Sequence, residues 1–279
     1  MISEPLLHVE NLSITFTSHD RRTSAVKSIS FSVAKGEVLA VVGESGSGKS
    51  VSALSLTRLL PSPPLCQIQG NIFWCGKDLQ KLSEDELTQI RGKEIAYIFQ
   101  DPGTSLNPVY TIGYQIAESV KIHEPTIKDT EAVVLQALQD VLIDDPRKVA
   151  QQYPHELSGG MQQRAMIAMA LACNPRLLIA DEPTTALDVT IQKEIIDLLK
   201  RLRQERKMSI LLITHNFGIV AHFADRVQVM RQGEIVESGE TTSVMQNPKH
   251  PYTRGLIACI PRLGQRRRRL TTLSEEMKP

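Results

Sequence analysis

The stretch GESGSGKS at residues 43–50 has almost no side chains and ends in a lysine and a serine. It fits the pattern G-x-x-x-x-G-K-[ST], in which glycines let backbone N–H groups converge on phosphate oxygens. Lys49 would reach the β- and γ-phosphates, and the Ser50 hydroxyl would ligate Mg²⁺. The residues assigned to nucleotide binding are Gly43, Glu44, Ser45, Gly46, Ser47, Gly48, Lys49, Ser50 and Val51. A flexible Gly-Ser turn is the alternative interpretation.

A second candidate is LLIADEP at residues 177–183, where four apolar residues precede two carboxylates. The apolar run predicts a buried strand that delivers Asp181 at its carboxyl end, where ligands bind in parallel sheets. Asp181 could hold Mg²⁺ through water, and Glu182 could polarise an attacking water as general base. An acidic strand end that caps the next helix is the alternative.

The third candidate is LSGGMQQR at residues 157–164. Ser158 can cap a helix, and Gly159 and Gly160 permit close approach to an anion. The helical pattern that follows would aim its positive end at that anion. One phosphate loop already covers a nucleotide from one side, so a second anion site in the same chain favours a head-to-tail pair of ATPase domains. Each ATP would then be closed by its own loop and by the partner's Ser-Gly-Gly.

The elements that must position these residues follow from hydrophobic periodicity. Alternation predicts antiparallel strands, and short apolar runs predict buried strands. The alternating segments are 6–16 and 25–33, and the buried runs are 37–42, 94–99, 176–181, 209–214 and 226–230. Residues 231–239 read as part of a hairpin with its turn at Gly233. Strands joined through a helix at 191–206 predict a parallel sheet.

Helical spacing marks two further segments. Residues 49–60 read as a helix that PSPP at 61–64 stops. The segment EAVVLQALQDVLI at 131–143 places one apolar face on a helix. That predicted face comprises Val134, Leu135, Leu138, Val141 and Leu142. We interpret residues 101 to about 152 as a helical insertion.

The motifs at 43–50, 157–164, 177–182 and 214–215 occur in this order in ATP-binding cassette (ABC) ATPases, which the chain resembles over roughly residues 6–260. The resemblance implies an α/β fold. It has a P-loop NTPase core of the RecA type, an antiparallel β subdomain and an inserted α-helical subdomain at about residues 101–160. Residues 261–279 would form a short basic tail.

The resemblance also assigns single residues. Gln100 is similar to the glutamine that contacts Mg²⁺ or the attacking water, and His215 to the histidine that hydrogen-bonds the γ-phosphate. Asp188 resembles an aspartate that touches the opposite subunit, and Gln162 falls within the Ser-Gly-Gly motif. Phe16 lies where an aromatic ring often stacks on adenine; a plain core phenylalanine is the alternative. The family usually has aspartate after the histidine, where this chain has Asn216, which puts a local hinge contact in doubt.

Composition excludes several other classes. Net charge is +1 and aromatic residues make up 4%, which argues against nucleic-acid binding. No run approaches the about 20 apolar residues of a membrane span, and the N-terminus lacks a signal-peptide core. The four cysteines have no zinc-ligand spacing, so we expect free buried thiols and no iron–sulfur cluster. Together with the family resemblance, the lack of a span implies a protein on the cytoplasmic face of the inner membrane, with its membrane-spanning partners as separate chains.

A narrower resemblance carries the expected substrate and partners. FQDPGTSLNPVYTIGYQI, YPHELSGGMQQR and NPKHPYTRGLIACIPRL are similar to dipeptide, oligopeptide and nickel importer ATPases. This implies two transmembrane permease subunits, a second ABC ATPase (a homologue or a copy of this chain) and an extracytoplasmic substrate-binding protein. The loop after Gln100 would dock the permease, unless it merely connects sheet to helices. Peptide-branch subunits often have a cysteine-rich tail. Because this chain lacks one, the assignment to peptides is weaker relative to nickel, metallophore or opine-like cargo.

Two other hypotheses remain open. A soluble ABC ATPase acting on ribosomes or DNA usually has two cassettes in one chain or a long coiled coil, and neither pattern is present. A non-catalytic nucleotide switch would need a damaged catalytic position. The catalytic candidates are all intact: Lys49, Gln100, Asp181, Glu182 and His215. The Arg266–Arg269 run could meet anionic lipid headgroups or be a solvated charge run.

Overall fold

The computed structural model describes residues 4–18, 21–185 and 187–259. The chain divides into two compact units, of which the first comprises residues 1–80 and 212–279 and the second residues 81–211. The first unit contains the glycine-rich loop, and the second contains the helical segment. The basic run Arg266–Arg269 and the predicted tail at 261–279 lie outside the described residues.

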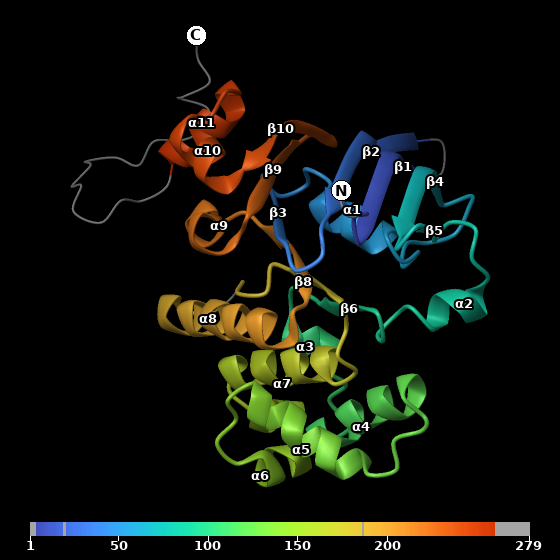
Figure 1. Cartoon of the computed structure of the whole chain (residues 1–279), viewed down its shortest axis with the longest axis vertical. Helices are drawn as coiled ribbons and strands as arrows, with labels where there is room; N and C mark the ends of the chain where they lie inside the picture. Colours follow the sequence, from blue (N-terminus) through green and yellow to red (C-terminus); the bar gives the residue numbers. More distant parts are fainter. Residues whose placement is uncertain (1–3, 19–20, 186, 260–279) are drawn as a thin grey trace. The chain divides into compact units, whose positions relative to one another are not determined.

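The first unit begins with an antiparallel sheet (Figure 1). Its strands lie in the order β2 (Arg21–Val33), β1 (Leu7–Ser18), β4 (Cys66–Trp74) and β5 (Lys77–Asp78). The register pairs Leu7 with Val33 on one side of β1 and with Trp74 on the other. Alternate residues of β1 are buried, so the two predicted antiparallel strands are confirmed.

The strand before the glycine-rich loop is β3 (Val38–Val42), which is buried along its whole length with no residue more than 7% exposed. It pairs in parallel with β9 (Arg226–Arg231), which pairs antiparallel with β10 (Glu234–Glu240). The β9–β10 turn has left-handed backbone at Gln232 (φ 49°) and Gly233 (φ 87°), as the predicted hairpin requires.

The helix after the loop is shorter than predicted. It is α1 (Lys49–Ser55), and Leu56 is its C-cap. The chain leaves the helix through Arg58, whose φ of 54° is left-handed, and the Leu59 N–H donates to Leu54. The helix therefore ends before the prolines that were expected to stop it, because a local turn satisfies its last carbonyl groups first.

The rest of the first unit lies C-terminal to β8 (Ser209–Thr214), along which the chain leaves the second unit. Three helices follow: α9 (Phe217–Phe223), α10 (Thr241–Gln246) and α11 (Pro251–Ala258). All residues of β8 are buried, so the strand holds the position of the residue that follows it, His215.

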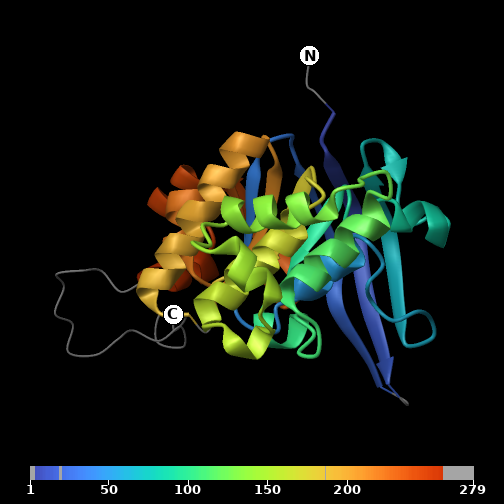
Figure 2. The ribbon, with the colours of Figure 1, turned by 90° about the horizontal axis from the view of Figure 1, so that it is seen from below.

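The second unit combines a parallel strand pair with a group of helices. Strands β6 (Ile95–Ile98) and β7 (Leu177–Asp181) pair from Ile95 opposite Leu177 to Ile98 opposite Ala180. Figure 2 shows several of its helices gathered together. The helices described in the second unit are α2 (Glu84–Thr88), α3 (Pro102–Ser105), α4 (Ile112–His123), α5 (Thr130–Asp140), α6 (Pro146–Gln151), the 3₁₀ helix η1 (Pro154–Glu156), α7 (Gly159–Leu171) and α8 (Val189–Arg206).

The apolar face predicted for residues 131–143 is only partly correct. Its buried members are Val134, Leu138 and Val141. Leu142 is 54% exposed and has a φ of 61°. Its prediction was wrong because α5 ends at Asp140, so helical spacing no longer applies. The next residue, Ile143, is buried instead.

Two arginines fasten the helices of the second unit. Arg206 on α8 donates to the Leu171 carbonyl (2.6 Å) and forms a short ion pair with Asp140. Arg164 on α7 donates to the Val141 carbonyl and to the Glu194 carboxylate, both at 2.9 Å. These bonds cross-link α5, α7 and α8. In the part of the chain that the structure describes, we find no helix with the length and apolarity of a membrane span.

Candidate functional site

The loop at 43–50 is shaped by two glycines that no other residue could replace without movement. A Cβ atom on Gly43 would lie 2.1 Å from the Met230 carbonyl oxygen. A Cβ on Gly48 would lie 2.6 Å from the Ala25 carbonyl oxygen, and Gly48 has a φ of 104°. Close backbone approach on both sides therefore requires glycine at these positions, independently of any bound anion.

The lysine of the loop is held inside it. Lys49 is 5% exposed, and its Nζ donates to the carbonyl oxygens of Gly43 and Glu44, both at 2.9 Å. An ammonium group is a donor only, so a phosphate oxygen bound in the loop would be a further acceptor for it. Ser50 and Val51 follow in the first turn of α1 and are half-buried.

Two contacts brace the loop from the C-terminal part of the first unit. The Glu44 N–H donates to the Tyr252 hydroxyl oxygen at 3.2 Å, and the Gly233 N–H donates to the Ser47 carbonyl at 3.0 Å. Sequence reasoning missed Tyr252. It lies in NPKHPYTRGLIACIPRL, which entered only as a mark of family branch.

The two carboxylates predicted for catalysis stand at the end of β7. Asp181 ends the strand, and Glu182 follows with a φ of 47°, which is unusual for a residue other than glycine. Glu182 Oε2 accepts hydrogen bonds from Gln100 Nε2 (3.3 Å) and Thr185 Oγ1 (2.7 Å). The structure thus brings Gln100 and Glu182 together, and strained backbone of this kind often occurs at active sites. Thr185, three residues after Glu182, was not predicted.

The candidate metal ligands fit Mg²⁺ by their chemistry. Ser50 offers a hydroxyl oxygen, Asp181 a carboxylate and Gln100 an amide oxygen, and Mg²⁺ prefers such oxygen donors. Among the described residues, no three histidine, cysteine, aspartate or glutamate side chains cluster as a metal site.

The Ser-Gly-Gly motif begins α7 and is open to solvent. The Ser158 hydroxyl accepts from the Met161 N–H (3.4 Å), so it caps the helix as expected. Ser158 and Gly159 are exposed, and a Cβ on Gly160 would lie 3.2 Å from Ile191. The Gln162 amide donates to two backbone carbonyls before the helix, at 2.9 and 3.3 Å. Gln162 therefore holds the motif in shape.

Two further candidates lie at helix starts. Asp188 is exposed and accepts from the Ile191 N–H at 3.0 Å, which makes it the N-cap of α8. Asn216 caps α9 by accepting from the N–H groups of Gly218 (2.9 Å) and Ile219 (3.4 Å). The departure at Asn216 therefore keeps the cap that an aspartate would also supply.

His215 and Phe16 both remain accessible within the first unit. His215 is exposed directly after the buried strand β8. Phe16 lies on β1 opposite Thr23 and Cys66, and it is half-buried rather than part of the closed core.

The segment after Gln100 presents apolar side chains to solvent. Val109 is 69% exposed, and Tyr110 (43%) and Tyr114 (49%) stack with ring centroids 4.6 Å apart. The buried Gln115 ties this loop to α4, since its amide donates to Asn107 and Tyr110 carbonyls at 3.0 Å. We call the surface of Val109, Tyr110 and Tyr114 the aromatic patch. The patch is exposed, and the hydrogen bonds of Gln115 hold its loop in place.

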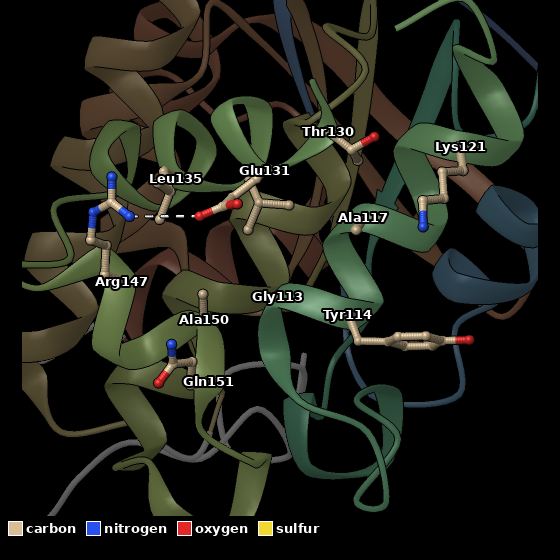
Figure 3. A pocket seen from close by; sticks show the side chains of 11 residues that line it. Gly113, Tyr114, Ala117, Lys121, Thr130, Glu131, Leu135, Arg147, Ala150 and Gln151 are labelled. Carbon is tan, nitrogen blue, oxygen red and sulfur yellow. Dashed lines mark ion pairs between the residues drawn. The ribbon is translucent and has the colours of Figure 1, made fainter. Parts of the chain in front are cut away.

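A cavity of about 520 Å³ lies among α4, α5 and α6 (Figure 3). Its wall includes Tyr114 and Lys121 from α4. Arg147 and Glu131, which form an exposed ion pair at 3.6 Å, also line it. None of the nucleotide-binding or catalytic candidates lines this cavity. It meets the aromatic patch at Tyr114.

The four cysteines are free thiols, as predicted, but only two are buried. Burial raises the pKa of the Cys66 thiol. The pKa of the Cys173 thiol is also raised, mainly by burial and next by the negative charge of Glu124. Cys75 is exposed and Cys259 is partly exposed, so the expectation that all four are buried was wrong. Cys75 follows β4 with a left-handed φ of 48°, in a turn that strand periodicity does not reveal.

Two models of known protein families match this chain. The ABC transporter family model matches residues 26–185. A second model, described as the oligopeptide/dipeptide transporter C-terminal region, matches residues 236–279. The chain is 51% identical over 259 residues to the oligopeptide transport ATP-binding protein OppD of Bacillus subtilis, covering 92% of this chain and 72% of OppD.

Two other similar proteins differ in how much of their own length this chain covers. The glutathione import ATP-binding protein GsiA of Shigella dysenteriae is 49% identical over 271 residues, which are 93% of this chain but only 42% of GsiA. The dimeric post-hydrolysis structure of the ATP-binding cassette MJ0796 bound to ADP and Pi is similar with a TM-score of 0.75 at 27% identity. That match covers 84% of this chain and 98% of MJ0796, and it confirms the predicted α/β fold.

Proposed function

The chain belongs to the ABC transporter family, and we propose that it is the ATP-hydrolysing subunit of a bacterial importer of dipeptides or oligopeptides. The observation that carries the substrate class is the match of residues 236–279 to the oligopeptide/dipeptide transporter C-terminal region, beside the family match at 26–185. The cargo itself would be selected by the membrane subunits and an extracytoplasmic binding protein. Nickel, metallophore or opine uptake is the alternative for the same ATPase role.

In this proposal the loop at 43–50 binds the phosphates of ATP and Phe16 stacks on the adenine. The backbone N–H groups of the loop and Lys49 supply the positive charge. Mg²⁺, held by Ser50, Asp181 and Gln100, would neutralise phosphate charge when bound. Support comes from the loop geometry around Gly43 and Gly48 and from the oxygen-donor set.

Glu182 is the proposed general base. Gln100 and Thr185 both donate to its Oε2, so the carboxylate is oriented before substrate arrives. A water beside this carboxylate could lose a proton as it attacks the γ-phosphate. His215, exposed after β8, is the proposed γ-phosphate contact.

The exposed start of α7 suggests that the site is completed by a second cassette. Ser158 and Gly159 are open to solvent at the positive end of a 13-residue helix. We place this end on the ATP held by the partner cassette, where Asp188 would also contact the partner. Either a homologous ATPase or a second copy of this chain fits the role.

The aromatic patch is the proposed docking surface for a cytoplasmic helix of the permease, at the inner face of the membrane. Large exposed apolar side chains on an anchored loop favour an interface over a plain connection. The patch meets the cavity at Tyr114, which gives an apolar helix both a face and a hollow to occupy. Two such permease subunits would pair with two cassettes.

The catalytic proposal is tested with Glu182→Gln. Removing a general base lowers a hydrolysis rate by about 10²- to 10⁴-fold, while the isosteric amide can still accept hydrogen bonds. We expect ATP binding without turnover, measured by filter binding and phosphate release. The control is Glu205→Gln on α8, because the Glu205 side chain is 55% exposed. This variant should hydrolyse ATP at the wild-type rate. Wild-type turnover by Glu182→Gln would refute the role of this carboxylate.

The transport proposal is tested by isolating the protein from its native cells in mild detergent and identifying what accompanies it by mass spectrometry. Two multi-span proteins and a second cassette ATPase would support the importer. Recovery of ribosomal or DNA-repair proteins alone would overturn the transport function while leaving the ATP site in place. Uptake of labelled dipeptide, competed by nickel or opine, then separates the cargo classes.

A further inference from the structure

We propose that Tyr252 is a positioning residue for the phosphate loop, through which the segment at residues 237–258 sets the affinity for nucleotide. The proposal rests on the nucleotide-binding function proposed for residues 43–50. It adds a residue on α11 that lies more than two hundred positions away in the chain, since Tyr252 and Glu44 are separated by 208 residues.

One peptide group of the loop is held at both of its ends. The carbonyl of Gly43 accepts from Lys49 Nζ at 2.9 Å, and the N–H of Glu44 donates to Tyr252 Oη at 3.2 Å. These two atoms belong to the same peptide plane, so the pair of bonds fixes its rotation. A phosphate oxygen that draws the lysine away would loosen the carbonyl end, and Tyr252 would still hold the amide end.

The tyrosine can act as a fixed acceptor because it is buried. Its side chain is 1% exposed, and the Arg231 guanidinium lies 4.9 Å from the ring centroid. Burial, followed by the Glu44 carboxylate, raises the pKa of the Tyr252 phenol, while the Glu44 N–H bond and Arg231 oppose this. The hydroxyl therefore keeps its proton at neutral pH and offers lone pairs to the loop.

The start of α11 is itself anchored to β10. The Glu237 carboxylate accepts from the N–H groups of Lys249 (2.7 Å) and His250 (3.0 Å). The His250 ring nitrogen Nδ1 accepts from the Tyr252 N–H at 3.1 Å. A chain of hydrogen bonds thus runs from β10 through the start of α11 to the loop.

The same hairpin supports the other end of the loop. The Gly233 N–H, in the β9–β10 turn, donates to the Ser47 carbonyl. The Met230 carbonyl stands where a side chain at Gly43 would be. Residues 226–258 therefore contact the loop at its first, second and fifth positions, which makes this segment a frame for the phosphate site rather than a separate tail.

The test compares Tyr252→Phe with wild type in the full chain, with Tyr153→Phe as the matched control. Phenylalanine keeps the ring and removes only the hydroxyl, and the control residue Tyr153 is 40% exposed. We expect Tyr252→Phe to weaken binding of Mg²⁺ and a non-hydrolysable ATP analogue by about five- to tenfold, the worth of one hydrogen bond. The KM for ATP should rise by a similar factor with kcat nearly unchanged, and Tyr153→Phe should match wild type.

A second readout does not depend on nucleotide. Hydrogen exchange of the Glu44 amide, followed by NMR, should be at least tenfold faster in Tyr252→Phe, while amides of β7 should keep their protection. Wild-type affinity together with unchanged Glu44 exchange would overturn the proposal. A wild-type chain that fails to bind the analogue would instead refute nucleotide binding, and the Glu44 exchange rate would still decide whether Tyr252 holds the loop.

Discussion

Replacing Gly48 by alanine tests whether the phosphate loop depends on close backbone contact or only on flexibility. The new Cβ would lie 2.6 Å from the Ala25 carbonyl oxygen and 2.9 Å from Met230 Cε. The methionine end can move, but the carbonyl belongs to β2 and cannot move without disturbing that strand. The φ of 104° adds strain of its own.

The magnitude follows from these two terms. A left-handed backbone costs an alanine about 1–2 kcal/mol. Forcing a methyl group into a filled space costs about 1–3 kcal/mol more. We therefore expect Gly48→Ala to lower the free energy of unfolding by about 2–5 kcal/mol and ATP affinity by at least tenfold, because the loop must shift to relieve the clash.

Gly36→Ala is the matched control. Gly36 has a φ of 75°, and nothing lies within 4 Å of its added Cβ, so only the strain of about 1–2 kcal/mol applies. Urea unfolding can be followed by the single tryptophan, Trp74, which is buried in the same unit. If Gly48→Ala equals Gly36→Ala in stability and binds ATP like wild type, close packing around the loop is not what requires glycine.

Three further predictions concern the supporting structure and are measured by urea unfolding. Asn216→Ala should cost about 0.5–2 kcal/mol by removing the cap of α9, while Asn216→Asp should cost little; equal losses would contradict the cap. Arg206→Ala should cost about 1–3 kcal/mol because it deprives the Leu171 carbonyl and the Asp140 carboxylate of a donor, whereas Arg147→Ala, at an exposed pair, should cost under about 0.5 kcal/mol. Burial raises the pKa of Glu237, but its hydrogen bonds outweigh this and lower it below 4.5. Its stabilisation should therefore be present above that pH and lost as the pH falls through the folded pKa, and Glu237→Gln should remove this pH dependence.

The sequence by itself determined the features that depend on neighbouring residues. Continuous apolar runs predicted β3, β7 and β8, because burial on both faces leaves no alternation. The glycine spacing at 43–50 predicted the loop between β3 and α1. The contacts that exclude a Cβ there come from Met230 and Ala25, which are distant in the sequence. Ser158 was predicted as a helix cap because capping joins residues two or three positions apart.

The tertiary structure decided where helices end and which residues distant in the sequence come into contact. Leu142 was misplaced because periodicity does not show where a helix stops, and here α5 ends at Asp140. The bond from Thr185 to Glu182 depends on a strained turn after β7. The bond from Glu44 to Tyr252 joins residues 208 positions apart. No local pattern encodes such a contact, since it exists only when β9, β10 and α11 fold back onto the loop.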